Sequence, residues 1–293
     1  MRDAVFGALA VLALSCGSPA PNVHVATTPA PDAGPSAKPE TEAEVDPSVP
    51  ADLRDAVKRS QHAGVLLAAF DHAAAVASDA LRGSGNTDLD RVLGFLAYPT
   101  DTDNWRVSFF VGDPPAIGFR VDLGRQKAPS VQRVDPPETP SAQLAAMFRA
   151  RQTVIATLKA ANASTQRLDP VVFPAAILGE SGMLVYMLAG TDRDDTVVLG
   201  KHWRARTSDD GTKLLELEPM SKTALELPAH PRNLPPGATP AGLYATHLVT
   251  PYPLESHVFA SLLSGLSIFV MTSRGVWKVD GAKITYVGEK PPQ

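Results

Sequence analysis

Between residues 62 and 218 the same succession of predicted elements occurs twice. Each half begins with a helix, and four strand-like runs separated by turn residues follow it. In the first helix the apolar residues recur three and four positions apart, which is typical of one helix face; they are Leu67, Phe70, Ala74, Ala77 and Leu81. This order predicts an α+β fold in which helices pack on antiparallel β-sheets.

The two halves also align at a constant offset of 78 residues. Nine identities occur in 52 aligned pairs, among them Phe70 with Phe148. We therefore expect a duplicated α-β-β-β-β unit, with residues 50–138 as the first α+β unit and residues 139–293 as the second, carrying a C-terminal extension. A single continuous α+β domain with coincidental similarity is the alternative. Strand orders that differ between the halves would exclude the duplication.

Local signals place several element boundaries in the second half. Thr139 followed by Pro140 predicts the start of its helix, because threonine caps free backbone N–H groups and proline suits the first helical position. The run 254–263 fits a short helix or a strand equally well. Asp280-Gly281 between alternating apolar runs predicts a C-terminal β-hairpin.

The first sixteen residues have the order of an export signal. Arg2 precedes the apolar run 4–14, which is shorter than the roughly 20 residues that a membrane-spanning helix needs, and Cys16 follows. This arrangement resembles the lipobox of bacterial lipoproteins, although Ala13 stands where that family usually has leucine. The resemblance implies that residues 1–15 are a signal peptide and that Cys16 is acylated, with palmitate as an expected modification, and tied to a membrane.

The segment after Cys16 differs in composition from the rest of the chain. Residues 17–50 contain eight prolines, six alanines and no aromatic residue. Such a segment buries too little apolar surface to offset the cost of ordering it, so residues 16–49 are expected to be a disordered Pro/Ala-rich tether. Because Cys16 is the only cysteine, the sequence excludes an internal disulfide, thiol catalysis elsewhere in the chain and a cysteine-ligated metal.

Charge further limits the classes of partner. Residues 51–293 carry 25 Lys and Arg against 25 Asp and Glu, so the net charge of −4 comes from the segment before them. A body without net charge lacks the basic surface that nucleic acids require. We therefore expect no nucleic-acid partner.

One group of residues suggests a reaction. Three imidazoles and a carboxylate can hold zinc and leave a position for water; the candidate ligands are His202, His247, Glu255 and His257. The chain has no HExxH motif, and these residues lie on three separate predicted elements. Alternation along a predicted strand places His202 on one face with Arg204 and Arg206, which is either an anion-binding or a solvated surface.

Other motifs are better explained by structure than by chemistry. Residues 179–183 resemble a nucleophile elbow, but Met183 stands where that motif needs glycine, so a hairpin turn is expected. Asp-rich residues 101–104 and 192–195 lack the glycine and glutamate of a calcium loop and are predicted to be turns. No catalytic residue and no cofactor are assigned.

Two short runs in the body, GKHWR at 200–204 and ESHVF at 255–259, look like those of uncharacterised exported bacterial proteins, a resemblance that implies no activity. We expect a membrane-anchored exported lipoprotein that acts as a non-catalytic binding or interaction module of the cell envelope. Its partner would be a protein, peptide or glycan, and its location the outer membrane or periplasmic face rather than the cytoplasm. The alternative is a metal-dependent hydrolase that uses the histidine cluster.

Overall fold

The computed structural model describes residues 44–163, 168–193, 195–229 and 242–289. The predicted signal peptide, Cys16 and most of the predicted tether lie outside these residues. The described chain has three α-helices and fourteen strands in sheets that are mostly antiparallel, which confirms the predicted α+β fold.

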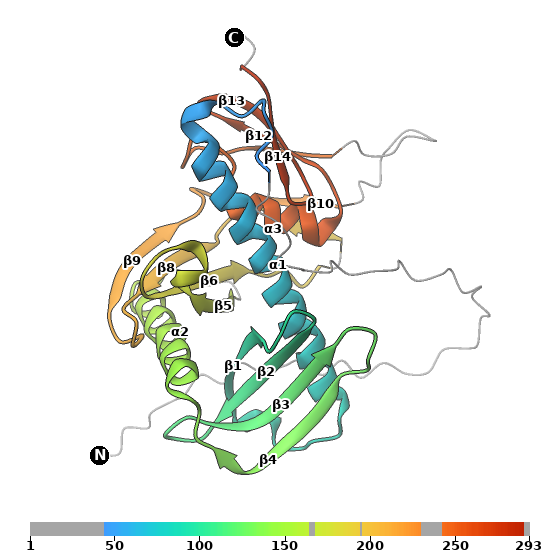
Figure 1. Cartoon of the computed structure of the whole chain (residues 1–293), viewed down its shortest axis with the longest axis vertical. Helices are drawn as coiled ribbons and strands as arrows, with labels where there is room; N and C mark the ends of the chain where they lie inside the picture. Colours follow the sequence, from blue (N-terminus) through green and yellow to red (C-terminus); the bar gives the residue numbers. More distant parts are fainter. Residues whose placement is uncertain (1–43, 164–167, 194, 230–241, 290–293) are drawn as a thin grey trace, which may run out of the picture. The chain divides into compact units, whose positions relative to one another are not determined.

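The first unit is a long helix followed by a four-stranded meander (Figure 1). A 3-10 turn, η1 (Ala51–Leu53), leads into α1 (Arg54–Gly83), and all five residues of the predicted apolar stripe are buried. The strands pair antiparallel in chain order; they are β1 (Val92–Pro99), β2 (Asn104–Val111), β3 (Ala116–Gly124) and β4 (Ser130–Glu138), and a 3-10 turn, η2 (Leu89–Arg91), precedes them.

The second unit repeats this plan. Helix α2 (Ala142–Ala160) begins after Ser141, whose hydroxyl accepts the backbone N–H of Leu144 at 3.3 Å. The predicted cap at Thr139 was therefore wrong by two residues. The sheet again follows chain order; its strands are β5 (Leu168–Pro174), β6 (Met183–Ala189), β8 (Trp203–Thr207) and β9 (Leu214–Pro219), with η3 (Ala175–Leu178) after β5. Strands β7 (Thr196–Val198) and β10 (Glu226–Pro228) form a separate pair.

Both four-stranded sheets follow chain order, so the duplication stays a prediction, and a single offset does not align the two sheets. Val107 and Val185 correspond at the offset of 78. Ala97 pairs with Val107 and Val172 pairs with Val185, so β1 and β5 correspond at an offset of 75. The identities of Phe95 with Phe173 and of Ala97 with Ala175 at offset 78 therefore do not mark equivalent positions of the two sheets.

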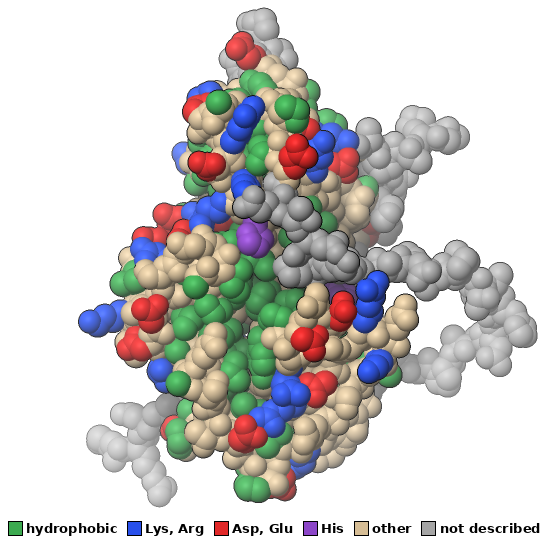
Figure 2. Space-filling model, viewed as in Figure 1, with side chains coloured by type: hydrophobic (Ala, Val, Ile, Leu, Met, Phe, Trp, Pro, Cys, Tyr) green, Lys and Arg blue, Asp and Glu red, His purple; other side chains and the backbone are tan. Residues whose placement is uncertain are grey.

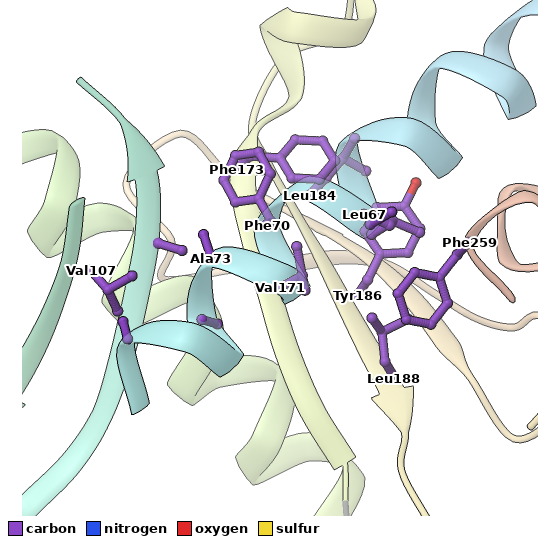
Figure 3. Packing of buried hydrophobic residues seen from close by; sticks show 14 of the residues in the cluster. Leu67, Phe70, Ala73, Val107, Val171, Phe173, Leu184, Tyr186, Leu188 and Phe259 are labelled. Carbon is purple, nitrogen blue, oxygen red and sulfur yellow. The ribbon is translucent and has the colours of Figure 1, made fainter. Parts of the chain in front are cut away.

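The two units share their cores. Phe70 of α1 packs edge to face on Trp105 of its own unit, with ring centroids 4.9 Å apart, and lies 5.2 Å from Phe173 of the second unit (Figure 3). Phe148 of α2 stacks on Phe110 of the first unit at 4.1 Å. Each helix thus covers its own sheet and also a face of the other sheet.

A third sheet follows, in the order β11-β12-β13-β14. Strand β11 (Leu243–Thr246) pairs parallel to β12 (Ile268–Thr272) through α3 (Glu255–Ser264), so the ambiguous run is a helix. Strands β13 (Gly275–Asp280) and β14 (Lys283–Gly288) form the predicted hairpin. Trp277 fills the core of this sheet and is fully buried.

The folded body extends further toward the N-terminus than predicted. The described chain starts at residue 44 rather than at Pro50, and Val49 is buried in the core of the third sheet. Asp46 pairs with Lys283 at 2.8 Å, and the Ser48 hydroxyl accepts the backbone N–H of Tyr286 at 3.1 Å. The last six residues of the predicted tether therefore belong to the folded body, because the valines of this polar segment pack in the core of the third sheet.

Helix α1 runs through the whole arrangement. Residues 51–83 are long and apolar enough to cross a membrane by length and composition alone, but half of the most apolar window is buried within the protein, as expected of a core helix. Gly64 lets α3 approach α1, since a Cβ there would lie 2.5 Å from Cγ1 of Val258 and 2.9 Å from the carbonyl oxygen of Glu255. This crossing places the first turn of α3 against the sheet of the second unit.

Candidate functional site

A buried carboxylate lies where α3 begins. Glu255 is only 2% exposed, and its Oε1 accepts two hydrogen bonds, from the Tyr186 hydroxyl at 3.0 Å and from Nη1 of Arg204 at 2.8 Å. Nη2 of Arg204 donates to Oε2 of Glu218 at 2.8 Å. A buried charge is tolerated when it is paired and hydrogen-bonded, and the N-terminal position on α3 favours a carboxylate further. Arg204 thus connects the interior to the surface.

The surface end of this network is a hollow of about 130 Å³. It lies over the face of β8 and β9 that carries the paired arginines and glutamates, and Arg59 of α1 and Glu180 of the turn after η3 also line it. Its charged side chains are three arginines and three glutamates; they are Arg59, Glu180, Arg204, Arg206, Glu216 and Glu218. Leu184 and Ala205 supply apolar contacts.

The charges of the hollow are neutralised in pairs. Arg59 meets Glu180 at 2.5 Å, Arg204 meets Glu218, and Arg206 meets Glu216. In the last two pairs the arginine on β8 lies directly opposite the glutamate on β9, because Arg204 is in register with Glu218 and Arg206 with Glu216. Opposite charges in such cross-strand positions attract. The hollow therefore offers donors and acceptors in alternation rather than a field of one sign. Figure 2 shows that acidic and basic side chains are also interspersed over the visible side of the molecule.

The network holds its groups in fixed protonation states. Burial raises the pKa of the Tyr186 hydroxyl well above its usual range, and the Glu255 carboxylate raises it further. Burial opposes the charged form of Arg204, but Glu255, Glu218 and Tyr186 outweigh this effect and raise the pKa of the guanidinium. At neutral pH the tyrosine stays protonated and the arginine charged, so neither serves as a general base.

The structure brings the predicted histidines closer together than their separation in sequence suggested. The rings of His247 and His257 meet edge to face with centroids 4.8 Å apart, and His202 is near enough to lower the pKa of His257. All three are buried. The prediction of His202 on an anion-binding or solvated surface was therefore wrong: its imidazole is buried, and only Arg204 and Arg206 line the hollow.

Each of these histidines is occupied by hydrogen bonds within the chain. Nδ1 of His202 accepts the N–H of Ala189 at 3.0 Å, and Nδ1 of His257 accepts the N–H of Leu254 at 3.1 Å. Nε2 of His247 lies 2.9 Å from the Thr250 hydroxyl. Burial lowers the pKa of His202 and of His247 to about 4 and that of His257 to about 3. All three are neutral imidazoles at pH 7.

Glu255, the fourth candidate ligand, points its carboxylate to Tyr186 and Arg204. Among the residues that the structure describes, no group of three or more His, Cys, Asp or Glu side chains is placed to hold a metal ion. The arrangement explains the histidines as packed polar residues of the core.

The sequence did not single out Tyr186, Arg59 or Glu180. Tyr186 stands in an apolar run, and its hydroxyl meets a carboxylate 69 residues further along the chain. The glutamates of β9 were detectable, because Glu216 and Glu218 alternate with apolar residues as Arg204 and Arg206 do on β8. That shared alternation was the available signal for the hollow.

The Asp-rich residues 101–104 form a turn, as predicted, whereas the predicted turn at 192–195 includes residue 194, which lies outside the described residues. Oδ1 of Asp101 accepts the backbone N–H groups of Asp103 and Asn104, each at 3.0 Å, within the β1–β2 connection. Gly182 has a φ of +92°, a conformation that glycine adopts without strain and that suits the turn before β6.

No protein-family model, no curated protein and no solved structure matches this chain.

Proposed function

We propose that this protein is an exported lipoprotein, anchored in a membrane of the cell envelope through Cys16, whose folded body is a non-catalytic binding module. The lipobox-like order before Cys16 supports the anchor. The described body begins at residue 44, so 27 residues separate it from Cys16, a length that extends up to roughly 80 Å at about 3 Å per residue. The body can therefore reach partners well away from the lipid surface.

The hollow over β8 and β9 carries the binding proposal. Its arginines and glutamates alternate, are partly exposed and are fixed by strand pairing, which makes them preformed partners for a ligand that presents both charges, such as a peptide segment. The titratable groups beneath the hollow are held by structural hydrogen bonds, so the site is suited to bind a ligand rather than to catalyse a reaction. The zinc-hydrolase alternative has no comparable support, because its four candidate ligands are turned to other partners.

Labelling with an alkyne analogue of palmitate in a bacterial host tests the anchor. The wild-type chain should take up the label and fractionate with membranes, whereas Cys16→Ser should do neither. The matched control adds Ser18→Cys to Cys16→Ser, which restores a thiol two positions from the lipobox cysteine. Labelling of that control, or an unmodified Cys16 thiol in membrane-extracted protein, would contradict the anchor.

Charge reversal in the hollow tests the binding proposal. Affinity purification from envelope extract with the wild-type body should recover partners that Arg206→Glu recovers at least tenfold less, since the change places three carboxylates together. Arg82→Glu is the control, because Arg82 forms an exposed ion pair with Asp79 near the end of α1. Equal recovery by the wild type and Arg206→Glu would remove the hollow from the proposal.

A further inference from the structure

Arg151 differs from the other described arginines in its partners. Eleven of them form ion pairs, and Arg54 and Arg149 donate to backbone carbonyls. Arg151 lies on α2 against β1, and its hydrogen bond within the described chain runs from Nη1 to Oε1 of the neighbouring Gln152 at 3.1 Å. No carboxylate of the described residues pairs with it.

The guanidinium lies flat against Gly94. A Cβ at Gly94 would be 2.6 Å from Cζ of Arg151 and 2.7 Å from each of its Nη atoms. These nearly equal distances show that the plane of the group faces the glycine, which any larger residue would prevent. The Phe148 ring, with its centroid 5.8 Å from Cζ, contributes a cation–π contact. The geometry thus leaves the edge of the guanidinium for a ligand.

The same group is only partly enclosed. Its Nε is buried and has no hydrogen-bond partner within the described chain. Nη2 has no partner there either, but it is not buried. Burial lowers the pKa of Arg151 to about 10, which still leaves it charged at neutral pH. A half-buried cation that lacks a counter-charge is costly, and an anion supplied from solution would offset that cost.

We propose that Arg151, held flat by Gly94, is the anchoring residue of an oxyanion-binding site that accepts a carboxylate or phosphate group of a ligand. The planar fork of an arginine suits both groups, because two parallel N–H donors match two oxygens. The site lies between α2 and β1 and involves none of the residues of the hollow, so it does not depend on the binding proposal above.

Thermal melting of the full-length chain carrying Cys16→Ser, at constant ionic strength, tests the site. Inorganic phosphate and acetate are titrated separately in place of chloride. A saturable rise in melting temperature of about 3–6 °C at ten times the dissociation constant is expected for at least one of the two anions. Their relative effect shows which oxyanion the site prefers.

Arg151→Met removes the charge and keeps an unbranched side chain. It should abolish the saturable response, leaving only the weak linear stabilisation that excluded salts give to any protein. Arg149→Met, two residues away on the same helix, should respond as the wild type does. Equal responses of the wild type and Arg151→Met to both anions would overturn the proposal.

A second measurement needs no variant. An arginine-specific dicarbonyl reagent is applied to the wild-type chain with and without the anion, and each modified residue is quantified by peptide mass spectrometry. Phosphate or acetate should slow modification of Arg151 at least fivefold and leave Arg149 unchanged. Unchanged modification of Arg151 by both anions would contradict the site even if Arg151→Met fails to fold.

Discussion

Lowering the pH from 7 to 5 is expected to destabilise the folded protein, because three of its histidines are buried in the neutral form. Burial lowers the pKa of His202 and His247 to about 4 and of His257 to about 3. An unfolded chain protonates its histidines near 6.5. As the pH falls below 6.5, the histidines of the unfolded state bind protons while those of the folded state stay neutral. The free energy of unfolding therefore decreases until the pH reaches the pKa values of the folded state.

The size of the effect follows from these values. Between pH 7 and pH 5 each histidine removes about 1.8 kcal/mol from the free energy of unfolding, or about 5–6 kcal/mol for the three together. Asp71 acts in the opposite direction. Burial and the neighbouring Asp169 raise its pKa to about 6, so its protonation returns about 1 kcal/mol over the same interval. The net loss of about 4 kcal/mol is a large part of the 5–15 kcal/mol typical of a folded protein.

Urea unfolding followed by tryptophan fluorescence at pH 7 and pH 5 measures this loss. His257→Asn and His202→Asn are the informative variants, because the asparagine oxygen takes the place of the Nδ1 that accepts a backbone N–H in each case. Each should reduce the pH-dependent loss by about 1.8 kcal/mol. His72→Gln, at an exposed position, should leave it unchanged. A wild-type stability that varies by less than 1 kcal/mol between the two pH values would refute the reasoning.

Four further changes have expected outcomes. Glu255→Ala should lower the free energy of unfolding by about 3–5 kcal/mol in the same urea titration, because it leaves a half-buried guanidinium without its buried partner. Glu216→Ala, in an exposed pair, should lower it by less than about 1 kcal/mol. Similar losses for the two variants would contradict a buried network. Gly64→Ala should lower the free energy of unfolding by about 1–3 kcal/mol, because the added Cβ forces α1 and α3 apart. Gly83→Ala, whose added Cβ would meet open space, should leave stability unchanged or raise it, as measured by calorimetry. Equimolar Zn²⁺ should leave the melting temperature unchanged, and a rise of several degrees would revive the metal alternative. Residues 44–138 alone should show no cooperative unfolding by circular dichroism, since the core of the first unit is completed by the second; a sharp transition would disprove the shared core.

Elements with a strong period could be predicted from the sequence, and elements set by long-range contacts could not. The stripe from Leu67 to Leu81 and the Asp280-Gly281 hairpin were predicted correctly, because local spacing and turn chemistry decide them. The helical state of α3 was not decided by its own residues. Its close packing on α1 requires Gly64, almost 200 positions earlier, a contact that the local sequence does not reveal.

His202 shows why the candidate site was only partly predictable. Strand alternation was extended through this residue, but Lys201 adopts a φ of +61° and interrupts the strand before β8 begins at Trp203. The imidazole packs edge to face on Phe259 of α3, with ring centroids 6.4 Å apart, and its Nδ1 accepts the N–H of Ala189. Because α3 comes from a later part of the chain, the burial of His202 had no local signal.

The position of α1 determines how the hollow is connected to the rest of the body. Phe70 fixes the helix between the first two sheets, and the side-chain oxygen of Gln61 accepts the backbone N–H of Ile284 at 3.1 Å in the third. Arg59 projects into the hollow from the same helix, two residues from Gln61, and its pairing with Glu180 closes one wall. A chain without an internal disulfide relies on such shared packing for rigidity. A ligand that displaces Glu180 from Arg59 therefore acts on a helix common to all three sheets, so its binding is coupled to the stability of the whole body.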